Sequence, residues 1–300
     1  MLMRSFLVTC VALFLAVVSS AANLETLEQK IADKQKELTY GASDDIRNQA
    51  SQEIRGLLLK AFNKEETFDY PFDKFIAIST IKSPDNAFRL FNWAQPHLDG
   101  TFSYYAFVLL PQKGGYVELS ENQELTLSIE NKAIGADNWY GALYYEIFPV
   151  KVKKEEYYVL MGWDGNNLLS NKKVLDALVI NKKGEITLGK SVFQTPEGMK
   201  HRRVFEYAKS AILNLRFLHT KDAIVFDRLE PEKSGLAGQY AFYIPSTAYN
   251  GYKVNRDGGL DLIEYLDMSR PESEEKGAEF NFPQRVKFDR HRTNTNPIRQ

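Results

Sequence analysis

The chain of 300 residues contains only one cysteine, Cys10, which lies inside the apolar first stretch of the sequence. Residues 7–10 loosely imitate a lipid-attachment motif. However, the apolar run continues well past Cys10, and we reject lipidation there. Once that stretch is removed, the mature protein has no thiol, which excludes disulfides and cysteine-ligated metals. Export without disulfides, together with the absence of any Asn-x-Ser/Thr acceptor, fits a bacterial envelope better than a eukaryotic secretory route.

The sequence also lacks an excess of charge and long apolar runs. It has 38 Lys and Arg against 39 Asp and Glu. A protein that binds nucleic acid shows a basic excess or stripe, so we expect no nucleic-acid partner. After Val18 no apolar run approaches the roughly 20 residues that a membrane-spanning helix needs. We therefore expect no transmembrane segment in the mature chain.

Complete catalytic and metal-binding motifs are missing as well. There is no Gly-x-Ser-x-Gly elbow, no His-Glu-x-x-His helix and no glycine-rich phosphate loop, and the four histidines are scattered. Residues 253–264 match an EF-hand calcium loop at several positions, but Lys253 stands where calcium needs a carboxylate. We interpret that stretch as a β-hairpin with an Asp-Gly-Gly turn. The sequence thus predicts no metal and no cofactor.

What the sequence does contain, first of all, is a signal peptide over residues 1–22. A basic start at Met1–Arg4 precedes an apolar run over 5–18, and small residues follow at 19–22. This order is typical of a cleavable secretory signal, and the run is too short to span a membrane comfortably. We predict an exported protein, periplasmic or secreted; an uncleaved N-terminal anchor is the alternative.

Residues 23–67 have the pattern of a helical hairpin. Apolar residues recur at helical spacing from Leu24 to Leu38 and again from Ile46 to Ala61, with a break at 40–42. Ser43 or Asp44 can cap the second helix, because a short side-chain oxygen accepts its unpaired amide groups. Each helix has one apolar stripe. It either packs on the domain that follows or binds a partner.

Residues 68–268 change to a strand-like pattern with short polar links. Phe88–Trp93 alternate, with Phe88, Leu90 and Asn92 on one face. Links of a few residues join antiparallel neighbours, whereas parallel strands need a long crossover. We therefore predict a mainly β fold, an antiparallel meander arranged as a barrel, a sandwich or a propeller-like array. The link 119–138 is the least readable part, and 269–300 is predicted to be a polar tail.

Several short motifs of this β region resemble a family of uncharacterised exported bacterial proteins. They are Trp-Tyr-Gly at 139–141, Gly-Trp-Asp-Gly-Asn at 162–166, Arg203–Tyr207 and Ile224–Asp227. The resemblance covers about residues 70–268 and leaves out the helices and the tail. It implies export, and it carries no catalytic residues.

The aromatic segments also provide the candidate binding site. Trp163 can act as a stacking platform beside the hydrogen-bonding groups of Asp164 and Asn166, and Trp139 and Tyr140 lie in the neighbouring aromatic segment. An aromatic ring beside carboxylate and amide groups is what a sugar or another polar ring requires. The structural alternative is a tight turn at 164–166, because glycine and asparagine tolerate positive φ.

Three functions are compatible with these features. The first is a non-enzymatic binding or structural module of the bacterial envelope, whose partner is an envelope protein or a glycan. The second is a carbohydrate-active hydrolase with two carboxylates that meet only in space, for which Glu146, Asp164, Glu206 and Asp227 are the candidates. The third is an envelope assembly factor that docks on its partner through the N-terminal helices.

Overall fold

The computed structural model describes residues 23–269, apart from 112–114, 123–128 and 154. Internal contacts divide the chain into two units, Met1–Asp267 and Met268–Gln300, and all elements named below belong to the first unit. The predicted signal peptide with Cys10 and nearly all of the predicted tail lie outside the described residues. No helix in the described part is both long and apolar enough to cross a membrane.

The described chain begins with two helices joined by a tight turn. The first covers residues 23–40, and the second, α2, covers Asp44–Phe62. Ser43 caps α2, because its Oγ accepts a hydrogen bond from the Ile46 amide at 3.3 Å. The apolar stripe of each helix is buried, as shown by Ile31 on the first and Ile54 on the second. The predicted hairpin therefore forms.

Three sheets follow the helices, and their strand pairs are antiparallel except for one short parallel pairing of β10 with β16. We call them the first, central and third sheets. The first has the order β1-β2-β3-β4, with β1 (Ile78–Lys82), β2 (Arg89–Pro96), β3 (Phe102–Leu110) and β4 (Gly115–Leu119). The central sheet has the order β5-β9-β8-β7-β6, with β12 beside β8: β5 (Ile134–Gly135), β6 (Leu143–Val152), β7 (Glu155–Asp164), β8 (Ser170–Ile180), β9 (Ile186–Leu188) and β12 (Arg202–Ala208).

The third sheet is built from the C-terminal strands, and short helical turns connect several elements of the unit. Its order is β11-β10-β16-β15-β14-β13. The bounds are β10 (Phe193–Thr195), β11 (Gly198–Lys200), β13 (Leu215–Leu218), β14 (Ala223–Pro231), β15 (Tyr243–Val254) and β16 (Leu260–Ile263). The turns are η1 (Glu65–Phe68), η3 (Ile129–Asn131), η4 (Ala136–Asn138), η5 (His219–Lys221), η6 (Ser234–Leu236) and η7 (Tyr240–Phe242).

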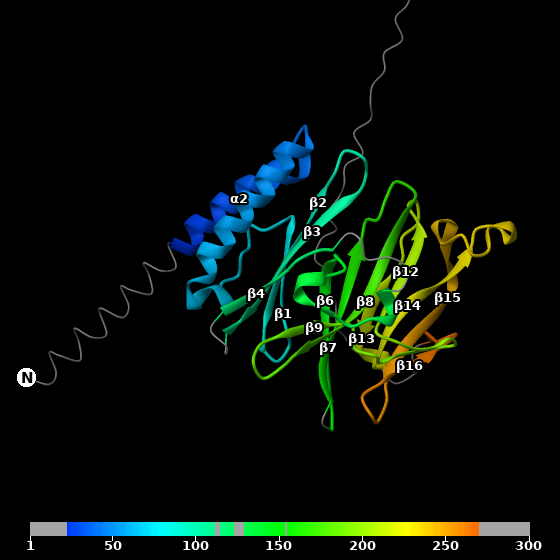
Figure 1. Cartoon of the computed structure of the whole chain (residues 1–300). Coiled ribbons are helices and arrows are strands. Elements are labelled where there is room, and N and C mark those ends of the chain that lie inside the picture. Colours follow the sequence, from blue (N-terminus) through cyan, green and yellow to red (C-terminus); the bar gives the residue numbers. More distant parts are fainter. Residues whose placement is uncertain (1–22, 112–114, 123–128, 154, 270–300) are drawn as a thin grey trace, which may run out of the picture. The chain divides into compact units, whose positions relative to one another are not determined.

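The helices and the sheets stack as four layers with three apolar cores between them (Figure 1). Ile54 and Leu58 of α2 pack with Phe91 and Trp93 of β2, so the hairpin covers the outer face of the first sheet. The other cores join the first sheet to the central sheet and the central sheet to the third. The predicted mainly β, antiparallel fold is confirmed, and of the three arrangements left open the sandwich-like stack fits.

Strand β2 shows how the sequence pattern produces this stacking. Side chains alternate across a strand, so Phe88 and Leu90 face the central sheet while Phe91 and Trp93 face the helices. Both faces are apolar because both are covered. The Trp93 indole also donates a hydrogen bond to Ser51 Oγ on α2 at 2.8 Å. The alternation predicted for residues 88–93 is therefore confirmed. The contacts of Phe91 and Trp93 attach the helices to the sheet.

Several hairpins form where the polar links predict them. Strand β6 pairs with β7, β8 pairs with β9, and β15 pairs with β16. The last pair confirms that the calcium-like stretch is a hairpin, in which the Asn255 amide donates to the Gly259 carbonyl and Gly258 has a φ of 85°. In the link 119–138, which the sequence pattern leaves hardest to interpret, residues 123–128 lie outside the described residues, while Ile129 begins η3.

Candidate functional site

The predicted site residues Trp163, Asp164 and Asn166 lie at the end of β7 and in the turn that leads to β8. Asp164 is buried, and Trp163 is half-buried with its ring edge-on to Phe102 at 5.2 Å. Asn166 has a positive φ of 45°. A Cβ on Gly165 would lie 2.2 Å from the Phe102 ring, so glycine is required where these two aromatic rings close over the turn.

Asp164 is the centre of a closed set of hydrogen bonds. Tyr104 Oη donates to Asp164 Oδ1 at 3.0 Å, and Tyr140 Oη donates to Oδ2 at 2.9 Å. The amide of Asn166 donates to Oδ1 at 2.7 Å. Burial, and then the neighbouring Asp164 charge, raises the pKa of both tyrosines far above its usual range, so both remain donors. The carboxylate therefore stabilises the turn with donors from three segments of the chain.

Lys172 on β8 joins Asp164 to a second carboxylate, Glu206 on β12. In the sheet register Lys172 lies opposite both residues. Its Nζ donates to Asn166 Oδ1 at 2.8 Å and lies 3.8 Å from Asp164 Oδ2. Glu206 accepts from Ser170 Oγ at 2.6 Å. Thus two of the four carboxylates considered for hydrolysis meet in one network, and internal donors already bind both of them.

The other two carboxylates lie elsewhere and have partners of their own. Glu146 Oε1 accepts from the Phe217 amide at 3.1 Å, and burial raises the pKa of Glu146 above its usual range. Asp227 Oδ2 accepts from the amide and the side chain of Asn214 at 2.8 and 2.9 Å. These contacts attach β13 to β6 and to β14, which is a structural use of both carboxylates.

Trp139 belongs to the interior rather than to the surface near Trp163. Its side chain is fully buried, and its Nε1 donates to Tyr144 Oη at 3.1 Å. Tyr144 Oη donates in turn to Asp176 Oδ2 at 3.2 Å, and Asp176 forms an ion pair with Arg202. Tyr140, the next residue, bonds to Asp164 instead. Trp139 therefore lies in one polar network and Tyr140, Asp164 and Asn166 in another, while Trp163 packs on Phe102 beside the second. The role of all five residues in ligand binding stays a prediction.

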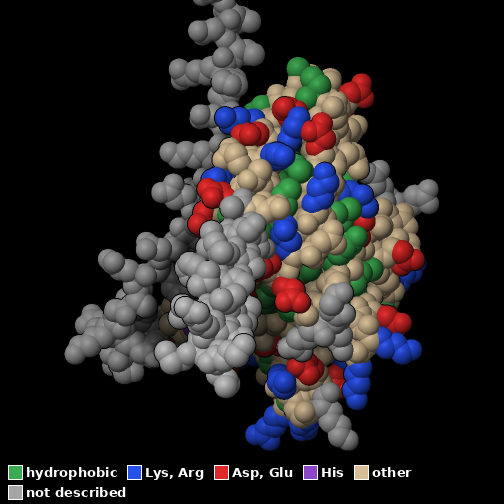
Figure 2. Space-filling model, turned by 90° about the vertical axis from the view of Figure 1, so that its left-hand side faces the viewer, with side chains coloured by type: hydrophobic (Ala, Val, Ile, Leu, Met, Phe, Trp, Pro, Cys, Tyr) green, Lys and Arg blue, Asp and Glu red, His purple; other side chains and the backbone are tan. Residues whose placement is uncertain are grey.

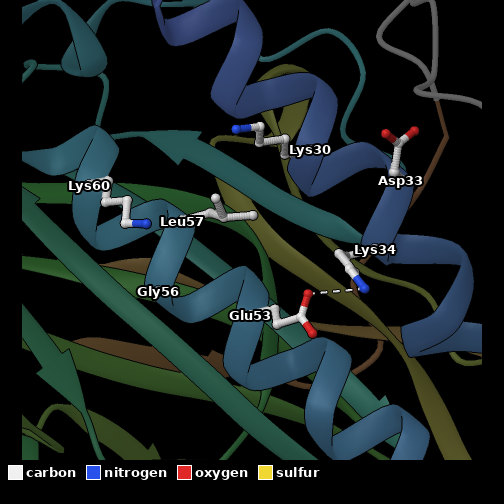
Figure 3. A pocket seen from close by; sticks show the side chains of 7 residues that line it. All are labelled: Lys30, Asp33, Lys34, Glu53, Gly56, Leu57 and Lys60. Atoms are coloured by element: carbon white, nitrogen blue, oxygen red, sulfur yellow. Dashed lines mark ion pairs between the residues drawn. The ribbon is translucent and has the colours of Figure 1, made fainter.

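A groove between the two N-terminal helices is a separate candidate, which the sequence reasoning did not identify. Its volume is about 460 Å³, and its lining residues come from both helices (Figure 3). At one end Lys34 forms ion pairs with Glu53 and Glu37, each at 3.0 Å. Toward the other end lie Lys30 and Lys60, for which the described residues supply no acidic partner. Figure 3 shows Leu57 between these two ends.

Gly56, which lines this groove, is the residue in the sequence that could have drawn attention to it. Glycine inside a helix costs about 0.5–1 kcal/mol relative to alanine. No atom lies within 4 Å of the position that a Cβ on Gly56 would take, so packing does not require glycine there. Its effect in the structure is to keep the groove open.

The described residues include no group of three or more His, Cys, Asp or Glu side chains arranged to hold a metal ion. Comparison with known proteins supplies no further assignment: no family model, curated protein or solved structure matches this chain.

Proposed function

We propose that this chain is an exported, non-enzymatic binding module that holds an acidic peptide segment of an envelope partner in the groove between its N-terminal helices. The observation that carries the proposal is that Lys30 and Lys60, which have no acidic partner among the described residues, line the same groove as Gly56, which leaves space there. The network around Asp164 supports it indirectly, because its polar groups are already bound to one another.

The ligand class follows from the charges. Lys30 and Lys60 lie on the exposed side of the groove and can bind carboxylates, while Leu57 offers an apolar contact between the charged ends. Three lysines and two carboxylates line the groove, so its net charge is positive. An extended segment in which acidic residues flank each apolar residue complements this pattern. Because these charges are exposed, binding should weaken as salt is added.

Point variants test this better than deletion of the hairpin, because the helices cover apolar residues of the first sheet such as Phe91 and Trp93. The probe is a fluorescent peptide, Asp-Leu-Glu-Glu-Leu-Glu, measured by anisotropy against its Asn/Gln analogue. We expect Gly56→Leu and the double variant K30E/K60E to weaken binding about tenfold. Gly56→Ala controls for helix propensity, and Lys36→Glu controls for charge at an exposed position of the first helix, which also carries Lys30.

Wild-type binding that equals that of Gly56→Leu or K30E/K60E would contradict the groove as the binding site. Equal binding of the acidic peptide and its neutral analogue would contradict the charge argument. Circular dichroism on each variant separates loss of binding from loss of structure.

Export is tested separately by expressing the full chain in a Gram-negative host and sequencing the N-terminus of the periplasmic protein. A mature chain that starts close to Asn23 is the expected result. A membrane-bound product that begins at Met1 would support the uncleaved anchor, and a cytoplasmic product would contradict export.

A further inference from the structure

One end of the groove between the helices is positively charged. Lys30 lies on the first helix and Lys60 on α2, and no acidic side chain of the described residues pairs with either of them. Figure 3 shows both lysines at this end, with Leu57 between them and the end that carries Lys34. Figure 2 views the face that carries the helices and shows Lys and Arg side chains among hydrophobic ones across its middle. This end therefore offers two positive charges to a ligand.

The other end of the groove has the opposite sign. Lys34 is the cation there, and its Nζ lies 3.0 Å from both Glu37 and Glu53. Asp33, also in the lining, accepts a hydrogen bond from Gln29 at 3.0 Å. Three carboxylates therefore accompany one lysine at this end. A segment that complements the whole groove has acidic side chains for the first end and a cation close behind them for the second.

The C-terminal part of the sequence contains a segment with this order of charges. Glu272, Glu274 and Glu275 form its acidic centre, and no other four consecutive residues of the chain include three carboxylates. Arg270 precedes this centre and Lys276 follows it directly. We call residues 270–276 the tail segment. Its charges match those of the groove in both sign and order.

A second copy of the chain can present the tail segment to the groove more readily than the same copy can. Near its described end the chain lies on the third sheet, where the Leu266 amide donates to the Tyr249 carbonyl of β15 at 2.7 Å. The helices form the opposite outer layer, with two sheets in between (Figure 1). Packed layers lie about 10 Å apart, so the helices are about 30 Å away through the body and farther around it. The six residues from Leu266 to Glu272 span at most about 20 Å.

We propose that the tail segment of one copy docks in the helical groove of a second copy, with its glutamates on Lys30 and Lys60. This inference rests on the function proposed above, and it adds a regulator of the same site, because a neighbouring copy then competes with the envelope partner. The contact joins two different surfaces of the chain. Such a head-to-tail contact produces chains that grow with protein concentration unless the rotation closes a ring. Added salt should weaken it, because the charges are exposed.

The test is sedimentation velocity of the exported, processed protein over a concentration series at low salt. We expect the wild type to associate, and we expect the tail variant E272Q/E274Q/E275Q and the groove variant K30E/K60E each to associate about tenfold more weakly. A mixture of the two variants should recover association but stop at the dimer, because each pair has one intact groove and one intact tail segment. The control E65Q/E232Q/E264Q neutralises three exposed glutamates of the first unit and should associate like the wild type.

A wild type that stays monomeric, or a tail or groove variant that associates as strongly as the wild type, would overturn the proposal. Docking of the tail segment in the groove of its own copy would also overturn it. That would appear as a monomeric wild type that binds the Asp-Leu-Glu-Glu-Leu-Glu peptide more weakly than the tail variant does at every protein concentration. Thermal unfolding verifies that each variant remains folded.

Peptide binding by the tail variant separates this inference from the proposed function. If the tail variant binds the peptide while the wild type does not associate, the tail contact fails and the groove remains a binding site. If the wild type associates through Lys30 and Lys60 while the tail variant does not bind the peptide, the contact between copies stands and the binding of a partner peptide fails.

Discussion

The buried ion pair between Arg202 and Asp176 offers the sharpest test of how the central sheet is stabilised. Both side chains are fully buried, and Arg202 Nε and Nη2 each donate to Asp176 at 3.1 Å. Arg202 Nη1 also donates to the Ile129 carbonyl at 2.8 Å. On the other side Tyr144 Oη donates to Asp176. Every charged oxygen and most donors of the pair therefore have a partner.

Removing one charge should cost far more than removing both. Asp176→Asn leaves the Arg202 cation buried without its counter-ion, for which we expect a loss of about 3–5 kcal/mol in the free energy of unfolding. Arg202→Met leaves the Asp176 anion alone, with a similar loss. In D176N/R202M neither charge remains, and the asparagine still accepts from Tyr144. The main residual cost is then that of the groups that lose Arg202, namely the Ile129 and Lys132 carbonyls and the buried amide N–H donors of the new asparagine, about 1–3 kcal/mol in all.

The assay is urea unfolding followed by tryptophan fluorescence, which reports directly because Trp139 donates to Tyr144 in the same network. The single losses should sum to about 6–10 kcal/mol, while the double variant should lose about 1–3 kcal/mol. Single variants can approach the whole stability of a domain, so all forms are measured in the same stabilising concentration of sucrose. A double variant that loses as much as the sum would refute the reasoning.

Three further predictions concern packing and pH. Burial lowers the pKa of Lys173 from 10.5 to about 8, so between these pH values the unfolded chain binds more protons and the folded state gains stability as the pH rises. Lys173→Met should therefore raise the free energy of unfolding by about 1–3 kcal/mol at pH 7. A gain that persists above pH 10.5 in urea unfolding would contradict this cause. Ser51→Ala should cost about 1–3 kcal/mol by leaving the Trp93 indole N–H unpaired, with exposed Gln52→Ala as the control in the same assay. Gly165→Ala should lower the melting temperature, because its Cβ would lie 2.2 Å from the Phe102 ring. Gly235→Ala is the control, because no atom lies within 4 Å of the position that its Cβ would take. Equal melting temperatures for the two variants would count against the closed turn.

Local patterns predicted those parts of the fold that depend on neighbours in the sequence. Ser43 begins α2, Phe88–Trp93 alternate across β2, and the short polar links become hairpins such as β15–β16. Periodicity and turn chemistry act over a few residues, so the sequence displays them directly. The stacking of three sheets was left open for the same reason. The alternation in a strand shows that a face is covered but does not identify the element that covers it.

The candidate sites show the limit of this reasoning most clearly. Asp176 and Arg202 are opposite each other only because β8 and β12 pair in one register. Likewise, the donors to Asp164 come from Tyr104 and Tyr140, on segments far apart in the chain. No local pattern reveals such contacts, so the sequence could not show that Tyr104 lies between Trp139 and Asp164, with its ring against Trp139 and its hydroxyl donating to Asp164. By contrast, Gly56 was visible in the sequence, because a helix interior has no local need for glycine.

The layered architecture itself restricts where this protein can contact other molecules. Each of the three interfaces between layers is an apolar core, and the described polar groups of the central sheet, such as Asp164 and Asp176, bond mainly to one another. A ligand that entered between layers would have to displace packed side chains and break these bonds at once. Partners should therefore meet the outer layers and the ends of the strands. The N-terminal hairpin carries the groove that we propose as a binding site. The Trp93–Ser51 hydrogen bond and the apolar contacts beneath it attach that hairpin to the first sheet on the side away from the groove lining, so we expect binding in the groove to require no rearrangement of the core.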